Sequence, residues 1–505
     1  MDFPILDTEL IRIASLSAAI LLLLAAVELM RRRFRIPVEI IRKSVHILTG
    51  VLIAFAPPLF PRGEPVVFIA SIFVLFNALA YARGWLTAVH HTQRRSYGTV
   101  YYPLSLLVLA ALFWDEYPDL VIASIMVMAI GDAAAGIVGE SMRRPHQYAV
   151  TSDKKSLEGS MAMFSGSFIA LLLILSVYGD SGLDFSRRWN ASPVLVISAL
   201  FAISLFATAL EAASSRGLDN LSVPFATAFA LHLCFASGVS SDAMLFLTGT
   251  ILGSGIAYLA WRLRMLSLSG AVATFILATI IFGIGGWKWT LPIFTFFILS
   301  SSLSRWRKNQ KAAYESIFEK SGTRDAGQVI ANGGLAALVC VAWYTSNDER
   351  LYVLYLIAVA VVTADTWGTE IGLLSRSHPR SILTFKEVPP GTSGGISIFG
   401  TLAGALGALV VTLTALPFIS LTTEILAFVL LAALAGSAID SILGATVQAQ
   451  YQCRHCGTQT EKPIHCNDAA TLLRGQAVVN NDAVNLLSTT ATLLLAGIAL
   501  LALGL

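Results

Sequence analysis

Two acidic residues interrupt an apolar stretch, VVTADTWGTEIGLL, at residues 361–374. Asp365 and Glu370 lie about 140° apart around a helix, so they do not share one face. A charge at the centre of a bilayer costs about 2.5–3.5 kcal/mol on insertion scales, so an acid in such a stretch is a candidate functional residue. We expect both acids and Asp440 to be catalytic. Asp365 and Glu370 should bind Mg²⁺ with Asp440, or with Asn332 and Asn485. Structural hydrogen bonding between helices is the alternative.

A glycine-rich segment, PPGTSGG, follows these acids at residues 389–395. Backbone N–H groups of such a loop suit an anion, and Lys386 lies just before it. The predicted phosphate-binding residues are Lys386, Gly391, Thr392, Gly394 and Gly395. Arg324 and Arg380 supply further positive charge. A flexible turn is the alternative interpretation.

The N-terminal half contains its own candidate residues. RKSVHILTG (42–50) supplies Arg42, Lys43 and His46 at a helix start, where we expect them to bind the nucleotide or its phosphates. Anchoring of the helix at the membrane surface is the alternative. In AIGDAAAGIVGE (129–140), Asp132 shares a helix face with Gly136 and Gly139. An acid beside small residues within a span suits catalysis and Mg²⁺ binding, or a hydrogen bond between helices.

Two further motifs are expected on the same side of the membrane. SDKKSLEGS (152–160) combines cations for phosphate with a carboxylate at a helix start, and an ordinary capped helix with basic residues is the alternative. EAASSRGLDNLSVP (211–224) adds Glu211 and further polar residues. The predicted catalytic residues here are Lys155 and Glu158, and the predicted nucleotide-binding residues are Lys154, Arg216, Asp219 and Asn220. The sequence lacks the P-loop and Rossmann glycine patterns, so phosphate binding must use a membrane-embedded site.

The segment CRHCGTQTEKPIHC (453–466) carries four soft ligands, Cys453, Cys456, His465 and Cys466. The first two have the spacing of a zinc knuckle. A structural Zn²⁺ and free thiols both remain open, because adjacent His465 and Cys466 must both reach one metal.

The composition predicts an all-α polytopic membrane protein. Of 505 residues, 56% are hydrophobic and only 13% charged, against about 25% in soluble proteins. The net charge of +3 gives no reason to expect a nucleic-acid partner. About sixteen apolar runs are long enough to span a bilayer at roughly 20 residues each. With the N-terminus outside, most Lys and Arg residues and all the motifs fall on the cytoplasmic side.

The chain divides into halves, residues 1–240 and 241–505, and the second carries the Cys/His loop at 451–467. The four motifs of the first half resemble the polyprenol kinase family, which includes phytol kinase and dolichol kinase and typically uses CTP. The segments VVTADTWGTEIGLL (361–374), PPGTSGGISIFGTLAG (389–404), GSAIDSILGATVQAQYQC (436–453) and NNDAVN (480–485) resemble phytyl-phosphate kinases of the DUF92-like membrane family. The resemblance implies a bifunctional fusion that converts phytol or a related prenyl alcohol to the monophosphate and then to the diphosphate. The products would serve tocopherol, phylloquinone or chlorophyll synthesis at a cytoplasmic or photosynthetic membrane.

The two reactions place different demands on their sites. An alcohol needs a base to accept its proton, which suits Asp132 or Glu158. A prenyl monophosphate is already ionised, so its site needs positive charge to bring two anions together. A multi-span transporter and a CTP-using cytidylyltransferase of membrane lipids are the competing interpretations. Clustering of the polar motifs on one side disfavours the transporter, and pyrophosphate release would identify the cytidylyltransferase.

Overall fold

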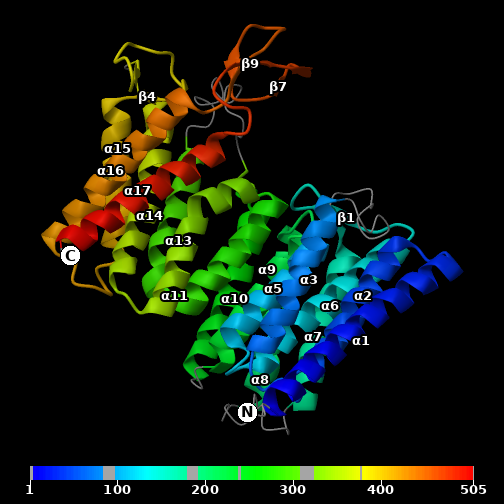
Figure 1. Ribbon diagram of the computed structural model, residues 1–505. Coiled ribbons are helices and arrows are strands. Elements are labelled where there is room, and N and C mark those ends of the chain that lie inside the picture. Colours follow the sequence, from blue (N-terminus) through cyan, green and yellow to red (C-terminus); the bar gives the residue numbers. More distant parts are fainter. Residues whose placement is uncertain are drawn as a thin grey trace. The chain divides into compact units, whose positions relative to one another are not determined.

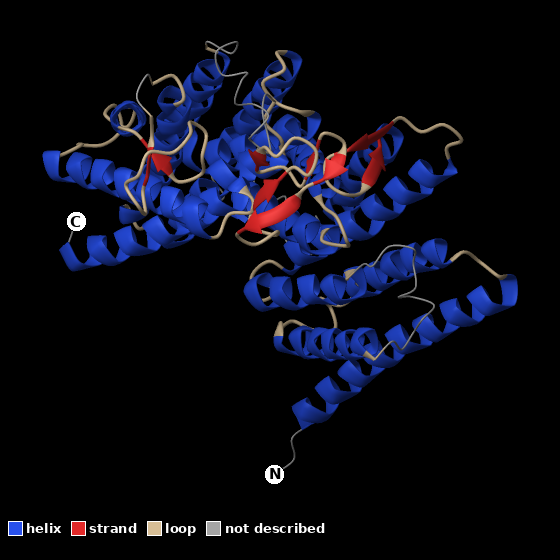
Figure 2. Ribbon diagram, turned by 90° about the horizontal axis from the view of Figure 1, so that it is seen from above, coloured by secondary structure: helices blue, strands red, loops and turns tan. Residues whose placement is uncertain are grey.

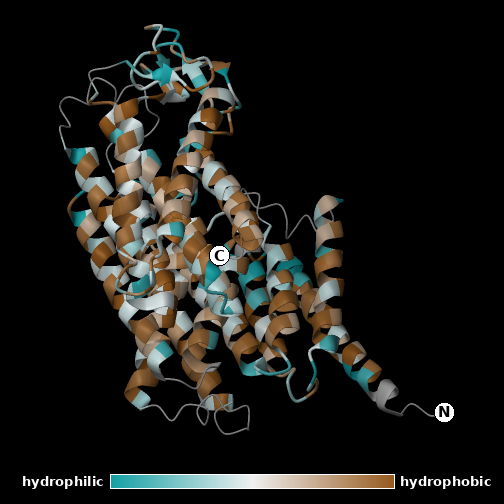
Figure 3. Ribbon diagram, turned by 90° about the vertical axis from the view of Figure 1, so that its left-hand side faces the viewer, coloured by the Kyte–Doolittle hydropathy of each residue, from teal (hydrophilic) through white to brown (hydrophobic). Residues whose placement is uncertain are grey.

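The computed structural model describes residues 4–83, 97–178, 192–236, 240–306, 323–375 and 378–503. Helices dominate these residues, and the strands are few and short (Figure 2). Hydrophobic residues cover most helix surfaces, whereas hydrophilic residues gather in strands and loops at helix ends (Figure 3). Eleven of the described helices are long and apolar enough to cross a membrane. The prediction of a helical, multi-pass membrane protein is therefore confirmed.

The chain forms two compact units, Met1–Thr250 and Ile251–Leu505 (Figure 1). The unit boundary falls inside the continuous helix α10 (Ser240–Arg262), whereas the sequence placed it at the start of this helix. The other elements of the first unit are, in chain order, α1 (Pro4–Phe34), α2 (Val38–Ala54), α3 (Glu64–Ala82), α5 (Gly98–Phe113), α6 (Pro118–Ser141), β1 (Gln147–Ala149), β2 (Lys154–Ser156), α7 (Leu157–Tyr178), α8 (Pro193–Ala213), α9 (Asp219–Leu231) and the π-helix η1 (His232–Ala236).

The second unit continues from α10 with long helices and short strands. Its elements are α11 (Leu268–Arg305), α13 (Ala326–Ser346), α14 (Arg350–Gly372), β3 (Arg380–Ser381), β4 (Gly395–Ile396), α15 (Ile398–Leu413), α16 (Thr423–Thr446), β5 (Gln450–Gln452), β6 (Gln459–Thr460), β7 (Ile464–His465), β8 (Asp468–Ala469), β9 (Thr471–Arg474) and α17 (Asn481–Leu503). The strands pair antiparallel as β3–β4, β6–β5–β9 and β7–β8. Figure 1 shows the labelled strands β4, β7 and β9 at one end of this unit's helices.

Each unit is built around one helix that is apolar on every side. Such a helix is stable when other helices cover all of its surface. In the most apolar 18-residue stretch of α6, 67% of the residues are buried, and in that of α14 61% are buried. Both shares are larger than in any other candidate span among the described residues. Asp132 lies in the second half of α6, and Asp365 lies in the second half of α14. The fold therefore places one candidate acid near the end of each central helix.

Helix α11 explains part of the difference between the predicted number of spans and the number of span-length helices. Its 38 residues would measure about 57 Å in a straight helix, against about 30 Å for the hydrocarbon core. Gly286, at φ 57° and ψ −148°, interrupts it between two span-length segments. The predicted count of sixteen spans is not confirmed. Every predicted run falls on a helix, but α2, α5, α9 and α15 have fewer than 18 residues and two runs form α11.

Candidate functional site

Three carboxylates from three helices of the first unit converge on one point. Asp132 of α6, Glu211 of α8 and Asp219 of α9 each offer an oxygen, and these oxygens lie within 4.8 Å of one another. Glu211 is buried and the other two are half-buried. Oxygen ligands at this spacing suit Mg²⁺, and the chemistry of the donor set therefore fits the expected metal. The sequence analysis gave roles to Asp132 and Asp219 and noted Glu211 without a role.

A β-hairpin brings a lysine to these acids. Strands β1 and β2 pair antiparallel, and neighbouring strand residues point to opposite faces, so Lys155 is half-buried while Lys154 is exposed. Lys155 forms an ion pair with Glu211. Burial opposes the charged form of Lys155, but Glu211 and Asp219 outweigh it and hold the pKa of the ammonium above its usual value. The site therefore contains a permanently charged cation beside its three acids.

The other basic residues of the first unit approach from α2. The Lys43 side chain is buried and occupies the space beside Gly136, where an added Cβ would lie 0.9 Å from its Nζ atom. Its ammonium lies 3.9 Å from Glu140. Arg42 and His46 lie on another face of α2 and interact electrostatically with Asp219.

An apolar cavity of about 590 Å³ has these two residues in its wall. Helices α1, α2, α3 and α5 line it, mostly with aliphatic side chains, and His46 lies in its wall with its ring stacked on Tyr102 at 4.6 Å. His46 Nδ1 and Thr99 Oγ1 are buried and have no hydrogen-bond partner among the described residues. The cavity thus combines a long apolar wall with polar atoms that are ready to bind a hydroxyl group.

The remaining predicted residues of the first unit have supporting contacts. Glu158 accepts hydrogen bonds from His146, 2.7 Å from its Nδ1 and 3.1 Å from its backbone nitrogen, so it faces the hairpin and not the carboxylate cluster. Arg216 has φ 54°, and its backbone N–H donates to Asp153 at 3.1 Å. Asn220 is buried, and its side-chain amide donates to the Gly217 carbonyl. Of the two bases considered for the alcohol, only Asp132 lies in the cluster.

The second unit contains a polar cavity of about 330 Å³. Asp365 of α14 and Asp440 of α16 line it with their carboxyl groups hydrogen-bonded to each other, and Ser488 of α17 donates to Asp440 at 2.9 Å. Two carboxyl groups in such contact hold either a shared proton or a metal ion between them.

The glycine-rich loop forms another wall of this cavity. Residues 390–397 all line it. Gly394 has φ +83°, and an added Cβ would lie 2.5 Å from the Ala445 side chain. The segment is therefore packed closely against α16 at Gly394.

Several predicted residues of the second unit lie outside this cavity. Glu370 faces α11, where Ser304 donates to it, so the expected grouping of Glu370 with Asp365 and Asp440 is wrong. Asp365 and Glu370 are five residues apart in α14, so their side chains point toward different neighbouring helices. Arg324 lies over the Phe296 ring at 5.5 Å and lines a separate apolar pocket with Asn332. Lys386 and Arg380 are exposed.

The asparagines join the cavity through α17. Asn485 donates to Asn332 at 3.2 Å, and Ser488 bonds both the Asn485 carbonyl and Asp440. A chain of polar contacts therefore links α13, α17, α16 and α14 within an otherwise apolar unit.

Two residues at this cavity had no role in the sequence analysis. Glu461, from the Cys/His loop, lines the cavity and accepts hydrogen bonds from Ser393 and Gln448 at 2.8 and 2.9 Å. Arg474 donates to the Ser393 and Gly444 carbonyls at 3.4 Å and brings a positive charge beside the cavity. No local motif distinguishes either residue, because only the tertiary fold brings them to the loop.

Comparison with known proteins shows which family and which relatives this chain resembles. Residues 251–493 match the family described as Integral membrane protein DUF92. Protein PGR of Arabidopsis thaliana is 32% identical over 274 residues, which are 49% of this chain and 94% of that protein. Phytol kinase of Synechocystis sp. is 35% identical over 204 residues, 40% of this chain and 82% of that protein. A probable chloroplastic phytol kinase of Triticum aestivum is 29% identical over 232 residues, 43% of this chain and 74% of that protein. No solved structure matches the chain.

Proposed function

Because the chain belongs to the DUF92 family of integral membrane proteins and is homologous to phytol kinases, we propose that it is a membrane-embedded kinase of prenyl alcohols. The observation that carries this proposal is that Arg42 and His46 line the large apolar cavity and also interact electrostatically with Asp219 of the carboxylate cluster. The cavity suits an isoprenoid chain, and the polar atoms in its wall suit the hydroxyl group.

The first unit then transfers a phosphoryl group from a nucleotide, with CTP as the proposed donor, to the alcohol. Asp132 would hold Mg²⁺, which would neutralise charge on the nucleotide phosphates. Glu211 positions Lys155, whose ammonium stabilises the transferred phosphoryl group. Asp219, which interacts with His46 beside the cavity, is placed to accept the hydroxyl proton. The products are the prenyl monophosphate and the nucleoside diphosphate.

The direct test is an assay of the purified chain with phytol, Mg²⁺ and γ-labelled CTP. Label should appear in phytyl monophosphate, and Asp132→Asn should reduce that rate by at least about 100-fold. Asp119→Asn, at the opposite end of α6, is the matched control. Absence of labelled lipid with every prenyl alcohol and nucleotide would overturn the proposal, and release of pyrophosphate would indicate a cytidylyltransferase.

We propose that the second unit phosphorylates the prenyl monophosphate to the diphosphate. The polar cavity supports this, because it combines the Asp365–Asp440 pair with a glycine-rich loop and the nearby Arg474 charge. The monophosphate needs no base, so the carboxyl pair would serve Mg²⁺ and the loop amides would bind phosphate. The diphosphate would then supply prenylation reactions of the tocopherol, phylloquinone or chlorophyll type.

The second activity is tested with phytyl monophosphate as the substrate. Asp365→Asn should abolish diphosphate formation while the first reaction continues. Asp348→Asn, on the loop before α14, is the control. A wild-type chain that never forms diphosphate, or an Asp365→Asn chain that forms it at the normal rate, would contradict this assignment.

A further inference from the structure

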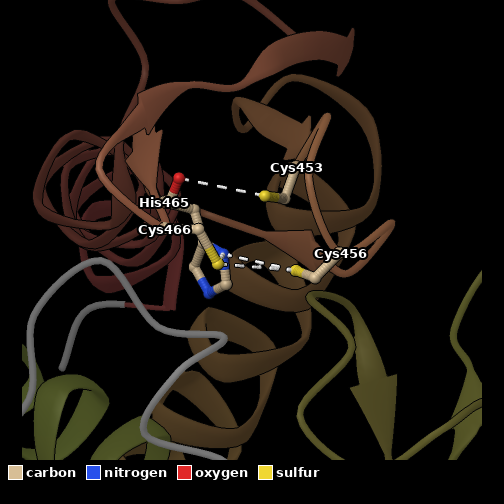
Figure 4. Close-up of side chains that lie close together, drawn as sticks. All are labelled: Cys453, Cys456, His465 and Cys466. Atoms are coloured by element: carbon tan, nitrogen blue, oxygen red, sulfur yellow. Dashed lines mark hydrogen bonds between the residues drawn. The ribbon is translucent and has the colours of Figure 1, made fainter.

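The Cys/His loop of the second unit brings four soft ligand atoms together. Figure 4 shows Cys456, His465 and Cys466 with their ligand atoms facing one another and Cys453 beside them. The four ligand atoms all lie within 4.8 Å of one another. We call these residues the Cys₃His cluster. We propose that it binds one structural Zn²⁺.

The separations between the ligand atoms of Cys456, His465 and Cys466 match those of a zinc tetrahedron, and Cys453 Sγ lies within 4.8 Å of all three. Zn–S bonds of about 2.3 Å and Zn–N bonds of about 2.0 Å place two sulfur ligands about 3.8 Å apart and a sulfur and a nitrogen about 3.5 Å apart. Cys456 and Cys466 Sγ lie 3.8 Å apart, and His465 Nδ1 lies 3.6 and 3.3 Å from them. A disulfide requires about 2.05 Å between the sulfurs. None of the three cysteines in this cluster forms a disulfide.

The backbone explains how neighbouring residues reach one metal. Cys466 and Asn467 form the two-residue turn between β7 and β8, with φ 52° and φ 60°. This turn type favours Asn and Gly, so a cysteine there is held in a conformation that costs free energy. Gly457, with φ 71°, closes the turn after Cys456. Both turns direct their ligands inward, which answers the geometric objection that the sequence left open.

The small size of the lobe supplies an independent reason for a metal. Residues 450–474 contain only strands of two to four residues. Ile464 and Leu473 are 66% and 50% exposed, so they form no core. A lobe without a hydrophobic core needs a cross-link or a metal to be ordered. Four protein ligands leave no open position for catalysis, so the metal is structural.

The metal has a consequence for the neighbouring cavity. Glu461 lies between Cys456 and His465 in the sequence and contacts the glycine-rich loop through Ser393. The zinc lobe therefore positions this carboxylate, and any effect on the second phosphorylation rests on the proposed function. Zinc binding itself does not.

The test measures metal in the purified full-length chain. Protein is purified in detergent without a metal-affinity step or chelator. Inductively coupled plasma mass spectrometry should then find about one Zn²⁺ per chain. Cys456→Ser and His465→Ala should each reduce the zinc content at least tenfold. Cys340→Ser, which changes a buried thiol of α13 outside the cluster, should retain it. Elution as a single species in gel filtration checks that each variant is folded.

A second measurement needs no variant. The exposed Cys456 and Cys466 thiols should resist alkylation in the wild-type protein and react after a strong zinc chelator is added. Zinc below a tenth of an equivalent, together with thiols that react at once or an oxidised Cys456–Cys466 pair, would overturn the proposal whether or not the chain is a kinase.

Discussion

Gly136 has no side chain, and the Lys43 side chain occupies the space beside it. The buried ammonium of Lys43 lies where a Cβ at position 136 would be, so no residue larger than glycine leaves Lys43 in place. Glycine at this position is therefore required by a neighbouring side chain and not by the backbone.

We expect Lys43 to bind the nucleotide phosphates, so Gly136→Ala, which displaces the Lys43 ammonium, should reduce the first phosphorylation to the level of Lys43→Met. The Lys43 side chain is flexible at its end and can move aside, so the melting temperature should change little. The double variant should be no worse than either single variant, since both remove the same interaction. Steady-state kinetics on the three variants measure this, and additive losses would contradict the pairing.

Lys155 and Lys154 are neighbours with opposite environments. Removal of the Lys155 ammonium by Lys155→Met should lower the rate on the order of 100-fold, because it stabilises charge on the transferred group. Lys154→Met, on the exposed face, should cost no more than about fivefold, as exposed charges contribute little. Because the pKa of Lys155 is raised, the charge persists across neutral pH, and Lys155→Met should change the height of the pH profile without changing its shape.

A structural effect of Lys155→Met must be separated from a functional one. The variant leaves the Glu211 carboxylate buried without its ion pair, which is destabilising. The double variant Lys155→Met with Glu211→Gln removes that charge. It should recover thermal stability but not activity, and a recovery of activity would show that Lys155 serves only the fold.

At the scale of elements, Gly286 divides α11 into two spans. Its φ of 57° with ψ of −148° belongs to a region that is essentially restricted to glycine. Phe282 and Trp287 pack edge to face at 5.1 Å across the break. The break at Gly286 therefore sets the direction of the second segment of α11 relative to the first.

Gly286→Ala should destabilise the second unit by about 1–3 kcal/mol. Gly255→Ala is the matched control, because an added Cβ there meets no atom within 4 Å and alanine favours a helix. Thermal unfolding in detergent should give a lower melting temperature for Gly286→Ala only. Equal melting temperatures would mean that the break tolerates a side chain.

The sequence predicts most of the helices and some of the residue pairs at the candidate sites. Hydropathy predicts the helices, and polar residues at their ends predict which segments meet, so Asp132 with Asp219 and Asp365 with Asp440 were within reach. The direction of Glu370 was not, because α14 is covered on every side and pattern alone does not say which helix covers which face. Glu461 and Arg474 depend on the folded lobe, which has almost no hydrophobic pattern.

At the scale of the whole molecule, the two units repeat one design without a visible sequence repeat. Each has a central buried helix with an acid near one end, and each has short strands beside that acid. If the units act in series, the intermediate is a prenyl monophosphate with a long apolar chain. Such a lipid stays in the bilayer, so it needs no protein channel to pass from one site to the other.

If the units act in series, two variant chains that each lack one activity should together carry out both reactions. Asp132→Asn should form no monophosphate, and Asp365→Asn should stop at the monophosphate. Reconstituted in the same liposomes with phytol and CTP, they should form diphosphate after a lag, because the monophosphate must accumulate and diffuse between molecules.

Separate liposomes provide the control for this experiment. Mixed after reconstitution, the two variants should form much less diphosphate, since the lipid intermediate leaves a bilayer slowly. Diphosphate formed equally fast in both arrangements would show that the intermediate exchanges through water. No diphosphate in shared liposomes, although each variant is active on its own substrate, would show that the intermediate passes only within one chain.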